Sequence, residues 1–335
     1  PLFADRWMTV QFSDRMDPDT ALVNPHKNKI TLMKRIGIAA VLVSAIVGIA
    51  LGVVYHGYPQ AALKAINIAY EWRAGVEAKS MEIDGYEVPY YEGGEGETLV
   101  LIHGFGDSMV SFLQTSAFLT EKYRVILPGV LGFGETSKAM DRDHSIRTQV
   151  ETFHKFFQKL GLKEFYLGGN SMGGHISAAY ALRYPKEIKR LILLNAAGLR
   201  LPGELPYSHS EESIETEADF DKYLGKVFVK KPWVPGPLKS YLIEKWKENH
   251  DSYNLIKEQI RRGQDYLLNG RVSAFTKKTL VLWGRQDRIV RLAIGEAYHK
   301  DLPNSQMEIY DPGGHSPQYE FPERTAKTIL QFLEE

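Results

Sequence analysis

The chain has 335 residues, and 44% of them are hydrophobic, so it can bury the core of one large domain and carry further segments. Its 41 basic and 41 acidic side chains cancel, which argues against a nucleic-acid partner, because proteins that bind nucleic acid usually have a basic excess. The chain has no cysteine, which excludes disulfides, thiolate catalysis and cysteine-ligated zinc or iron–sulfur centres.

An uncharged apolar segment at residues 36–55 is the first predicted element. In a helix its 20 residues extend over about 30 Å, the thickness of the hydrocarbon core of a bilayer. Basic residues precede it and aromatic residues suited to a membrane interface follow it, namely Lys27, Lys29, Lys34, Arg35, Tyr55, Tyr58 and Trp72. We therefore expect an uncleaved single-pass membrane anchor at residues 34–57, with the catalytic domain on the extracytoplasmic (periplasmic) side.

Two other interpretations of this apolar segment stay open. It would be a cleaved signal peptide if translation began at Met33, although no A-x-A cleavage site follows and the run is longer than a usual signal core. It would be a buried helix of a soluble domain if its basic flank were incidental. Residues 1–33 show no sustained periodicity, and we interpret them as a loosely ordered tail or as an artefact of translation upstream of the true start.

Residues 58–79 have the spacing of an amphipathic helix, with apolar side chains at Ala62, Leu63, Ile66, Ala69 and Tyr70. The pattern predicts a juxtamembrane helix. Its apolar face packs either on the folded domain or on the bilayer surface, because periodicity alone does not show what an apolar face contacts.

Strand and helix patterns alternate from residue 80 onward. Strands are predicted at 81–83, 87–91, 98–103, 123–127, 165–169, 190–195, 279–283 and 306–310, and helices at 111–120, 145–160, after residue 173 and at 323–333. The alternation is typical of an α/β fold with a mostly parallel sheet and helices on both faces. Five prolines interrupt the pattern between residues 199 and 275. We therefore expect a cap domain at 199–275, inserted into a core formed by 80–198 and 276–335.

The sequence Gly169-Asn170-Ser171-Met172-Gly173 joins an apolar strand to a helix and places Ser171 at the apex of the turn. Such a turn is sharp and strained, and its small flanking residues let the backbone segments pack closely. It exposes the hydroxyl, while the N-terminus of the following helix favours the negative charge of an oxyanion. Ser171 is therefore the candidate nucleophile of an acyl-transfer site.

The loop His103-Gly104-Phe105-Gly106 follows a predicted strand, at the sheet edge where open α/β proteins hold their ligands. Its glycines allow close backbone approach, so the N–H groups of Phe105 and Met172 are the candidates for an oxyanion hole. We expect His103 to hold the loop by hydrogen bonding rather than to act as a base.

Asp287 and His315 each follow a later predicted strand and are the candidate orienting residue and base. Either one alone could be a loop residue in a turn. Together with Ser171 they fall in the chain order Ser, Asp, His that this architecture uses, which favours a catalytic role for all three.

Residues 80–335 resemble the α/β-hydrolase superfamily through the motifs HGFGDS (103–108), GNSMGG (169–174), WGRQD (283–287) and GGHS (313–316). The resemblance implies Ser171 as nucleophile, His315 as base and Asp287 as the residue that orients the base. The apolar N-terminal segment and the stretch after the elbow are similar to membrane-associated monoacylglycerol lipases and bacterial esterases. The elbow is also similar to that of carbon–carbon bond hydrolases that cleave meta-ring-fission products. Haloalkane dehalogenases and epoxide hydrolases need aspartate at the elbow, so Ser171 argues against both.

One position departs from the family pattern. Many relatives have an aspartate before the Pro-Gly that follows the fourth strand, whereas this chain has Leu127, and its loop through Gly134 looks longer. The difference puts the packing of this loop in doubt but does not affect the three candidate catalytic residues.

The expected activity is hydrolysis of an apolar or lipid-derived ester, of the monoacylglycerol type for example, at a membrane and without a metal or organic cofactor. Aromatic side chains of the cap either form its own core or line an acyl pocket, and we expect Phe105, Trp233 and Phe228 to contact substrate. A carbon–carbon bond hydrolase would use the same three catalytic residues, so the motifs do not exclude it. A non-catalytic binding protein of this fold would usually lack one of them. The sequence leaves the oligomeric state open.

Overall fold

The computed structural model describes residues 25–136, 140–203, 207, 213–263 and 267–335. The chain divides into two compact units, and the second begins at Tyr58. Residues 1–24 of the predicted tail lie outside the described residues.

The first unit contains one 33-residue helix, α1 (Pro25–Gly57). Its 22 residues from Ile36 to Gly57 are long and apolar enough to cross a membrane, and the most apolar window is not buried. The helix starts within the segment that the sequence assigned to a loosely ordered tail, so that prediction is wrong for residues 25–33. Proline fits the first turn of a helix, and no further proline or glycine follows Pro25 before Gly37.

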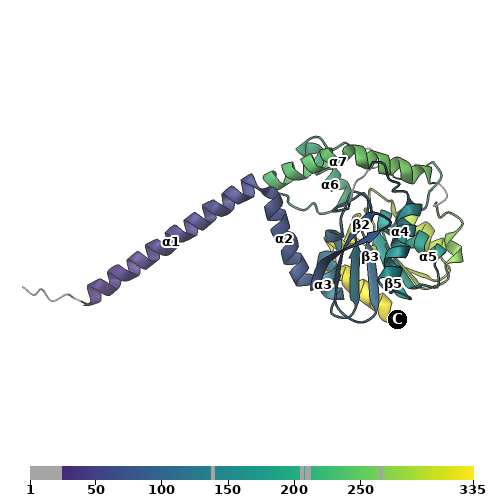
Figure 1. The fold of residues 1–335 in the computed structure, drawn as a ribbon, viewed down its shortest axis with the longest axis horizontal. Coiled ribbons are helices and arrows are strands. Elements are labelled where there is room, and N and C mark those ends of the chain that lie inside the picture. Colours follow the sequence, from purple (N-terminus) through teal and green to yellow (C-terminus); the bar gives the residue numbers. More distant parts are fainter. Residues whose placement is uncertain (1–24, 137–139, 204–206, 208–212, 264–266) are drawn as a thin grey trace, which may run out of the picture. The chain divides into compact units, whose positions relative to one another are not determined.

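The second unit contains an eight-stranded sheet (Figure 1) with the strand order β1-β2-β4-β3-β5-β6-β7-β8. Strand β2 (Tyr86–Gly93) pairs antiparallel with β1 (Val76–Ile83) and β4 (Arg124–Pro128), and the other neighbours are parallel. The remaining strands are β3 (Thr98–Ile102), β5 (Phe165–Asn170), β6 (Ile188–Leu194), β7 (Thr279–Gly284) and β8 (Ser305–Tyr310). The mostly parallel sheet predicted from the sequence is confirmed.

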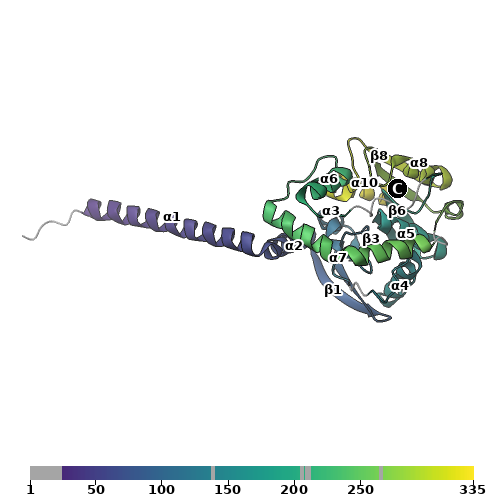
Figure 2. The same ribbon diagram turned by 90° about the horizontal axis from the view of Figure 1, so that it is seen from above.

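Helices cover both faces of this sheet (Figures 1 and 2). Successive residues of a strand point to opposite faces, so Leu99 and Leu101 of β3 join one core while Val100 and Ile102 join the other. The helices on the first face are η1 (Met109–Phe112), α3 (Leu113–Leu119) and α10 (Pro322–Glu334), and those on the second are α4 (Ile146–Lys159), α5 (Met172–Arg183) and α8 (Leu292–Asp301). Burial on both faces explains why the central strands are continuous apolar runs.

Helix α2 (Pro59–Ala74) is shorter than predicted. Gly75 adopts a left-handed conformation with φ of 61°, and its N–H donates to the carbonyl groups of Glu71 and Trp72. This conformation is least costly for glycine and ends the helix. The chain then enters β1 at Val76, so the prediction of a helix up to residue 79 is wrong.

Between β6 and β7 the chain leaves the sheet and forms α6 (Glu217–Val227), α7 (Gly236–Arg262) and the short helix η4 (Val272–Ala274). The Thr216 hydroxyl accepts the Asp219 N–H, and the Asp219 carboxylate accepts the Thr216 N–H, which fixes the start of α6. A small separate core lies between α6 and α7 and contains Ile214, Phe220, Leu224 and Ile243. The insertion between the two strands is confirmed, while the limits of a cap domain at 199–275 stay a prediction.

Candidate active site

Ser171 lies at the sharp turn between β5 and α5, with φ of 56° and ψ of −117°, a strained conformation for a residue with a side chain. Neighbouring backbone packs against this turn so closely that only glycine fits beside it. A Cβ atom on Gly169 would lie 2.4 Å from the carbonyl carbon of Gly173, and one on Gly173 would lie 2.0 Å from the carbonyl oxygen of Ile102. The Ser171 N–H donates to the carbonyl of Leu194 over 3.0 Å, which ties the turn to the neighbouring strand.

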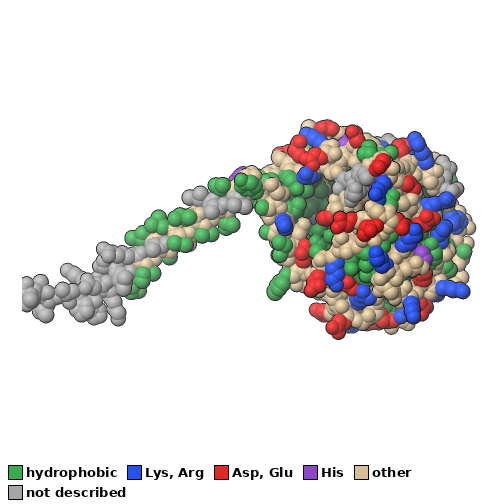
Figure 3. Space-filling model, viewed as in Figure 1, with side chains coloured by type: hydrophobic (Ala, Val, Ile, Leu, Met, Phe, Trp, Pro, Cys, Tyr) green, Lys and Arg blue, Asp and Glu red, His purple; other side chains and the backbone are tan. Residues whose placement is uncertain are grey.

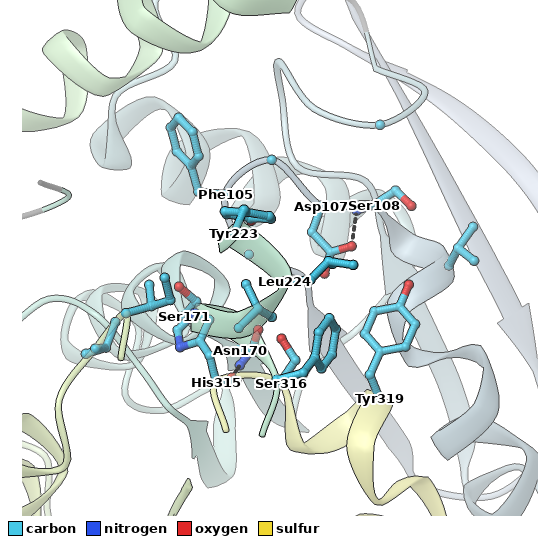
Figure 4. Close-up of a pocket in the computed structure, with 18 of the residues that line it drawn as sticks. Phe105, Asp107, Ser108, Asn170, Ser171, Tyr223, Leu224, His315, Ser316 and Tyr319 are labelled. Atoms are coloured by element: carbon cyan, nitrogen blue, oxygen red, sulfur yellow. Dashed lines mark hydrogen bonds between the residues drawn. The ribbon is translucent and has the colours of Figure 1, made fainter. Parts of the chain in front are cut away.

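The structure brings Asp287 and His315 into contact. Nδ1 of His315 donates to Oδ2 of Asp287 over 2.8 Å, and both side chains are more than nine-tenths buried. The other carboxylate oxygen, Oδ1, accepts the N–H groups of Ile289 (2.7 Å) and Val290 (2.9 Å). Because an ionised carboxylate only accepts, Nδ1 carries the ring proton and Nε2 is left with a lone pair. In Figure 4 the Ser171 hydroxyl lies next to the His315 ring, so the three residues predicted as a catalytic set come together.

Two buried asparagines to which the sequence analysis assigned no role hold these groups in place. Asn195, just after β6, donates from Nδ2 to Oδ2 of Asp287 (2.6 Å) and to the carbonyl of Gly314 (3.2 Å). Asn170, the last residue of β5, donates from Nδ2 to the carbonyl of His315 (2.9 Å). The available signal was an amide at the end of an otherwise apolar strand, but such a pattern does not reveal which distant loop the amide contacts.

His103 supports the loop that carries Phe105. The Val130 N–H donates to Nε2 of His103 (2.9 Å), so Nδ1 carries the proton and donates to the carbonyl of Gly104 (2.9 Å). Burial lowers the pKa of His103 to about 4, which keeps the ring neutral. This is the geometry expected for a residue that holds a loop. A Cβ atom on Gly104 would lie 3.1 Å from Cβ of Ser171, so the loop packs directly against the elbow.

The two candidate oxyanion donors come from two segments that meet at Ser171. Phe105 is in the loop after β3, and Met172 is the first residue of α5. The N–H groups in the first turn of a helix have no acceptor within the helix, so the Met172 N–H can be directed at a bound oxygen.

The loop after β4, which departs from the family pattern, is fixed by buried contacts. Leu127 is fully buried in the core on the side of α3 and α10. Oε1 of Gln149 accepts the Leu131 N–H (3.1 Å), and Nε2 of Gln149 donates to the Leu131 carbonyl (2.9 Å). The Thr136 hydroxyl donates to the carbonyl of Val130 (2.9 Å). The loop is therefore packed without an aspartate at position 127.

A cavity of about 1440 Å³ adjoins Ser171 and His315. Core loops, the cap helices α6 and α7, and α2 form its wall, and Figure 3 shows a hollow bordered by hydrophobic side chains beside α2. The apolar and aromatic lining includes Phe105, Tyr223, Leu224, Phe228, Trp246 and Ile66. A concave, mostly apolar site with a few polar groups at one end suits a molecule with an alkyl chain.

The three residues predicted to contact substrate have different positions. Phe105 and Phe228 line the cavity, whereas Trp233 does not and has 85% of its surface exposed. Pro232 and Val234 on either side of Trp233 do line the cavity. The prediction for Trp233 is therefore wrong.

Helix α2 has two apolar faces with different surroundings. Ile66 and Tyr70 line the cavity. Ile66 also has 43% of its surface exposed, and Ile68 and Trp72 have 52% and 85%. The sequence left open whether the apolar face of this helix packs on the domain, and the structure shows that part of it does.

The chain is similar to known hydrolases over most of its length. The sequence profile of the alpha/beta hydrolase fold matches residues 97–322. Lipase 1 of Psychrobacter immobilis is 33% identical over 270 residues, which cover 78% of this chain and 85% of that protein. Monoacylglycerol lipase ABHD6 of Mus musculus is 26% identical over 303 residues, which cover 82% of this chain and 88% of that protein.

The chain is also similar to solved structures of hydrolases. The structure of a membrane phospholipase A, described as a bacterial virulence factor, is 34% identical with a TM-score of 0.77, covering 90% of this chain and 98% of the other. A meta-cleavage product hydrolase from Pseudomonas fluorescens has a TM-score of 0.64 at 23% identity, covering 76% and 97%, and shows the fold alone. The sheet order, the strained serine elbow and these similarities lead to one conclusion: the chain belongs to the α/β-hydrolase fold family and is related to bacterial lipases and monoacylglycerol lipases.

Proposed function

We propose that this protein is a membrane-anchored serine esterase that hydrolyses apolar carboxylic esters, such as monoacylglycerol-type lipids, through an acyl-enzyme on Ser171. The observation that carries the proposal is the buried 2.8 Å hydrogen bond between His315 and Asp287 beside a serine on a strained turn. This arrangement provides a nucleophile and a base at the wall of an apolar cavity. Relatives named as lipases, a monoacylglycerol lipase and a phospholipase A support a lipid-derived substrate.

In the first half of the proposed reaction, Ser171 Oγ attacks the acyl carbonyl while Nε2 of His315 takes the hydroxyl proton. Asp287 stabilises the imidazolium that forms. The N–H groups of Phe105 and Met172 bind the oxyanion of the tetrahedral intermediate. The intermediate collapses, the bond from the acyl carbon to the alcohol oxygen breaks, and His315 gives its proton to the departing alcohol.

In the second half, water replaces the alcohol. His315 takes a proton from the water as it attacks the acyl-enzyme, and the same N–H groups bind the second oxyanion. The bond to Ser171 Oγ breaks, Ser171 recovers its proton from His315, and the carboxylic acid is released as its anion. These steps need no metal or organic cofactor.

The proposed location follows from α1. Its 22 apolar residues from Ile36 to Gly57 are long enough for one membrane crossing, and the basic residues before them support a cytoplasmic N-terminus. We place the catalytic domain, with a core at 80–198 and 276–335 and a cap at 199–275, on the extracytoplasmic side. Protease treatment of intact spheroplasts tests this location: digestion of the domain from outside is expected, and full protection would contradict it.

Labelling by a fluorophosphonate tests the nucleophile. We expect Ser171→Ala to abolish both labelling and turnover of p-nitrophenyl acyl esters. Ser177→Ala is the matched control, because Ser177 is a buried serine of α5, the helix that follows Ser171, and its hydroxyl donates to the carbonyl of Gly173 (2.8 Å). That variant should keep its labelling. Normal turnover in Ser171→Ala would refute the proposal.

A substrate panel separates ester hydrolysis from carbon–carbon bond hydrolysis, which would use the same three residues. It contains p-nitrophenyl acyl esters of graded chain length and a ring-fission dienoate. We expect turnover of the esters with a preference for alkyl chains that the apolar cavity can hold. Turnover of the dienoate without turnover of any ester would favour the carbon–carbon hydrolase.

A further inference from the structure

Four acidic residues of the described chain line the cavity, namely Asp107, Glu135, Glu248 and Glu320. Glu135 and Glu248 are exposed, and Glu320 accepts the N–H groups of Val229 and Gly314. Asp107 follows the loop that carries Phe105 and lines the cavity together with Ser171 and His315. In Figure 4 its carboxylate projects into the space near Leu224 and Tyr319. Its Oδ1 accepts the Ser108 N–H over 2.8 Å. Within the described part of the chain, no lysine or arginine forms an ion pair with Asp107.

The basic side chains that line the cavity lie at its exposed parts. They are Arg200, Lys230, Lys245 and Arg291, all of them exposed, and Lys245 also pairs with Glu248. Water screens exposed charges far more strongly than charges inside a cavity. These four basic side chains therefore compensate the charge of Asp107 only weakly.

The titratable groups that face Asp107 are His315, Glu135, Tyr223, Tyr253 and Tyr319. Burial raises the pKa values of the three tyrosines, that of Tyr253 to about 12, so they stay neutral. Burial also raises the pKa of Asp107 itself to about 6, against the opposing effects of the Ser108 N–H, the Ser111 hydroxyl and His315. Asp107 is therefore an anion at pH 8 and mostly neutral at pH 5.

We propose that Asp107 makes the cavity select against anionic alkyl chains, including the fatty-acid anion that ester hydrolysis releases beside it. The proposal rests on the ester hydrolysis proposed above. An ester is uncharged at its carbonyl, so it enters without repulsion. Hydrolysis creates a carboxylate next to Ser171, and this new charge meets the charge of Asp107 in a cavity that screens poorly. Asp107 thus lowers the affinity for product relative to substrate and promotes product release.

The test compares two inhibitors with the same alkyl chain. Octanesulfonate keeps its negative charge at every pH used, and 1-octanol is neutral. Inhibition constants are measured against a p-nitrophenyl ester with the full-length protein in a non-ionic detergent. Asp107→Asn removes the charge at nearly constant shape, and Glu135→Gln removes an exposed carboxylate that also lines the cavity.

At pH 8 we expect Asp107→Asn to bind octanesulfonate about tenfold more tightly than the wild type. The variant removes one negative charge that repels the sulfonate in a region of intermediate dielectric constant. Its affinity for 1-octanol should change less than twofold, and so should both affinities of Glu135→Gln. Below pH 6 the wild type should approach Asp107→Asn, because Asp107 is then protonated.

Equal shifts for sulfonate and octanol in Asp107→Asn would overturn the proposal, since they would indicate a change of cavity shape. A tenfold effect of Glu135→Gln would also overturn it. If Asp107→Asn does not fold, Asp107→Ser serves as the second variant. If the wild type hydrolyses no ester, the proposed function fails separately, and thermal stabilisation by the two ligands still measures the charge preference without turnover.

Discussion

Replacement of Asn195 tests how the candidate site is held together. Its amide is fully buried and donates to Asp287 (2.6 Å) and to Gly314 (3.2 Å). Asn195→Ala removes a hydrogen bond to a charged group, worth about 1.5–3 kcal/mol, and a neutral one, worth about 1 kcal/mol. The backbone of Asn195 is also left-handed, with φ of 46°, a conformation that costs alanine about 1 kcal/mol relative to glycine. We expect Asn195→Ala to lose about 3–5 kcal/mol of unfolding free energy.

Asn195→Gly is the matched control, because it removes the same hydrogen bonds without the backbone strain. It should be about 1 kcal/mol more stable than Asn195→Ala in denaturant unfolding. Both variants should lose about 10- to 100-fold in kcat, because Asp287 is no longer held against His315. KM should stay within about threefold, because the change lies beneath the catalytic groups and lost orientation lowers kcat rather than substrate binding.

Two results would refute this reasoning about Asn195. Equal stability of the alanine and glycine variants would show that the left-handed backbone carries no strain. A wild-type kcat in both variants would show that Asn195 does not position Asp287. An increase in KM without a fall in kcat would instead indicate that the variants deform the cavity.

Two further predictions concern the framework of the site. Gly173→Ala should lose more than about 4 kcal/mol or fail to fold, because its Cβ would lie 2.0 Å from the Ile102 carbonyl oxygen; Gly225→Ala in α6, where the nearest atom is 3.7 Å away, should keep its thermal unfolding midpoint. A folded, stable Gly173→Ala would contradict the close packing of the elbow. Burial lowers the pKa of His103 from 6.5 to about 4, so the unfolded chain binds more protons and stability falls as pH drops from 6.5 to 4, by about 3 kcal/mol. His103→Gln should not show this loss. Denaturant unfolding measures both proteins, and a difference in unfolding free energy that stays constant from pH 6.5 to 4 would exclude the effect of His103.

The sequence predicted Ser171, Asp287 and His315 because each role restricts both the residue type and its place at a strand end. Parallel strands then bring their carboxyl ends to one edge of the sheet, so chain order and strand order together imply proximity. The positions of Asn195 and Asp107 carry no such restriction. Many polar residues follow strands, and only the folded chain shows that one of them contacts Asp287 and the other lines the cavity.

The cap was predictable as an insertion but not as a binding surface. Prolines and a broken strand pattern indicate where the chain leaves the sheet, and α6 and α7 lie there. Which aromatic side chains face the cavity depends on the local backbone. Phe228 and Trp233 are both aromatic residues of the same stretch, yet of these two only Phe228 lines the cavity. Trp233 is exposed, while Pro232 and Val234 on either side of it line the cavity.

Helix α2 shows the limit of periodicity most clearly. Its apolar residues were consistent with packing on the domain or on a bilayer. In the structure, packing on the domain describes only some of them. Ile66 and Tyr70 form part of the cavity wall, while Ile68 and Trp72 expose apolar surface. Hydrophobic periodicity gives one average direction for the apolar side chains of a helix. It therefore cannot describe a helix whose apolar side chains lie partly at a cavity and partly on the exposed surface.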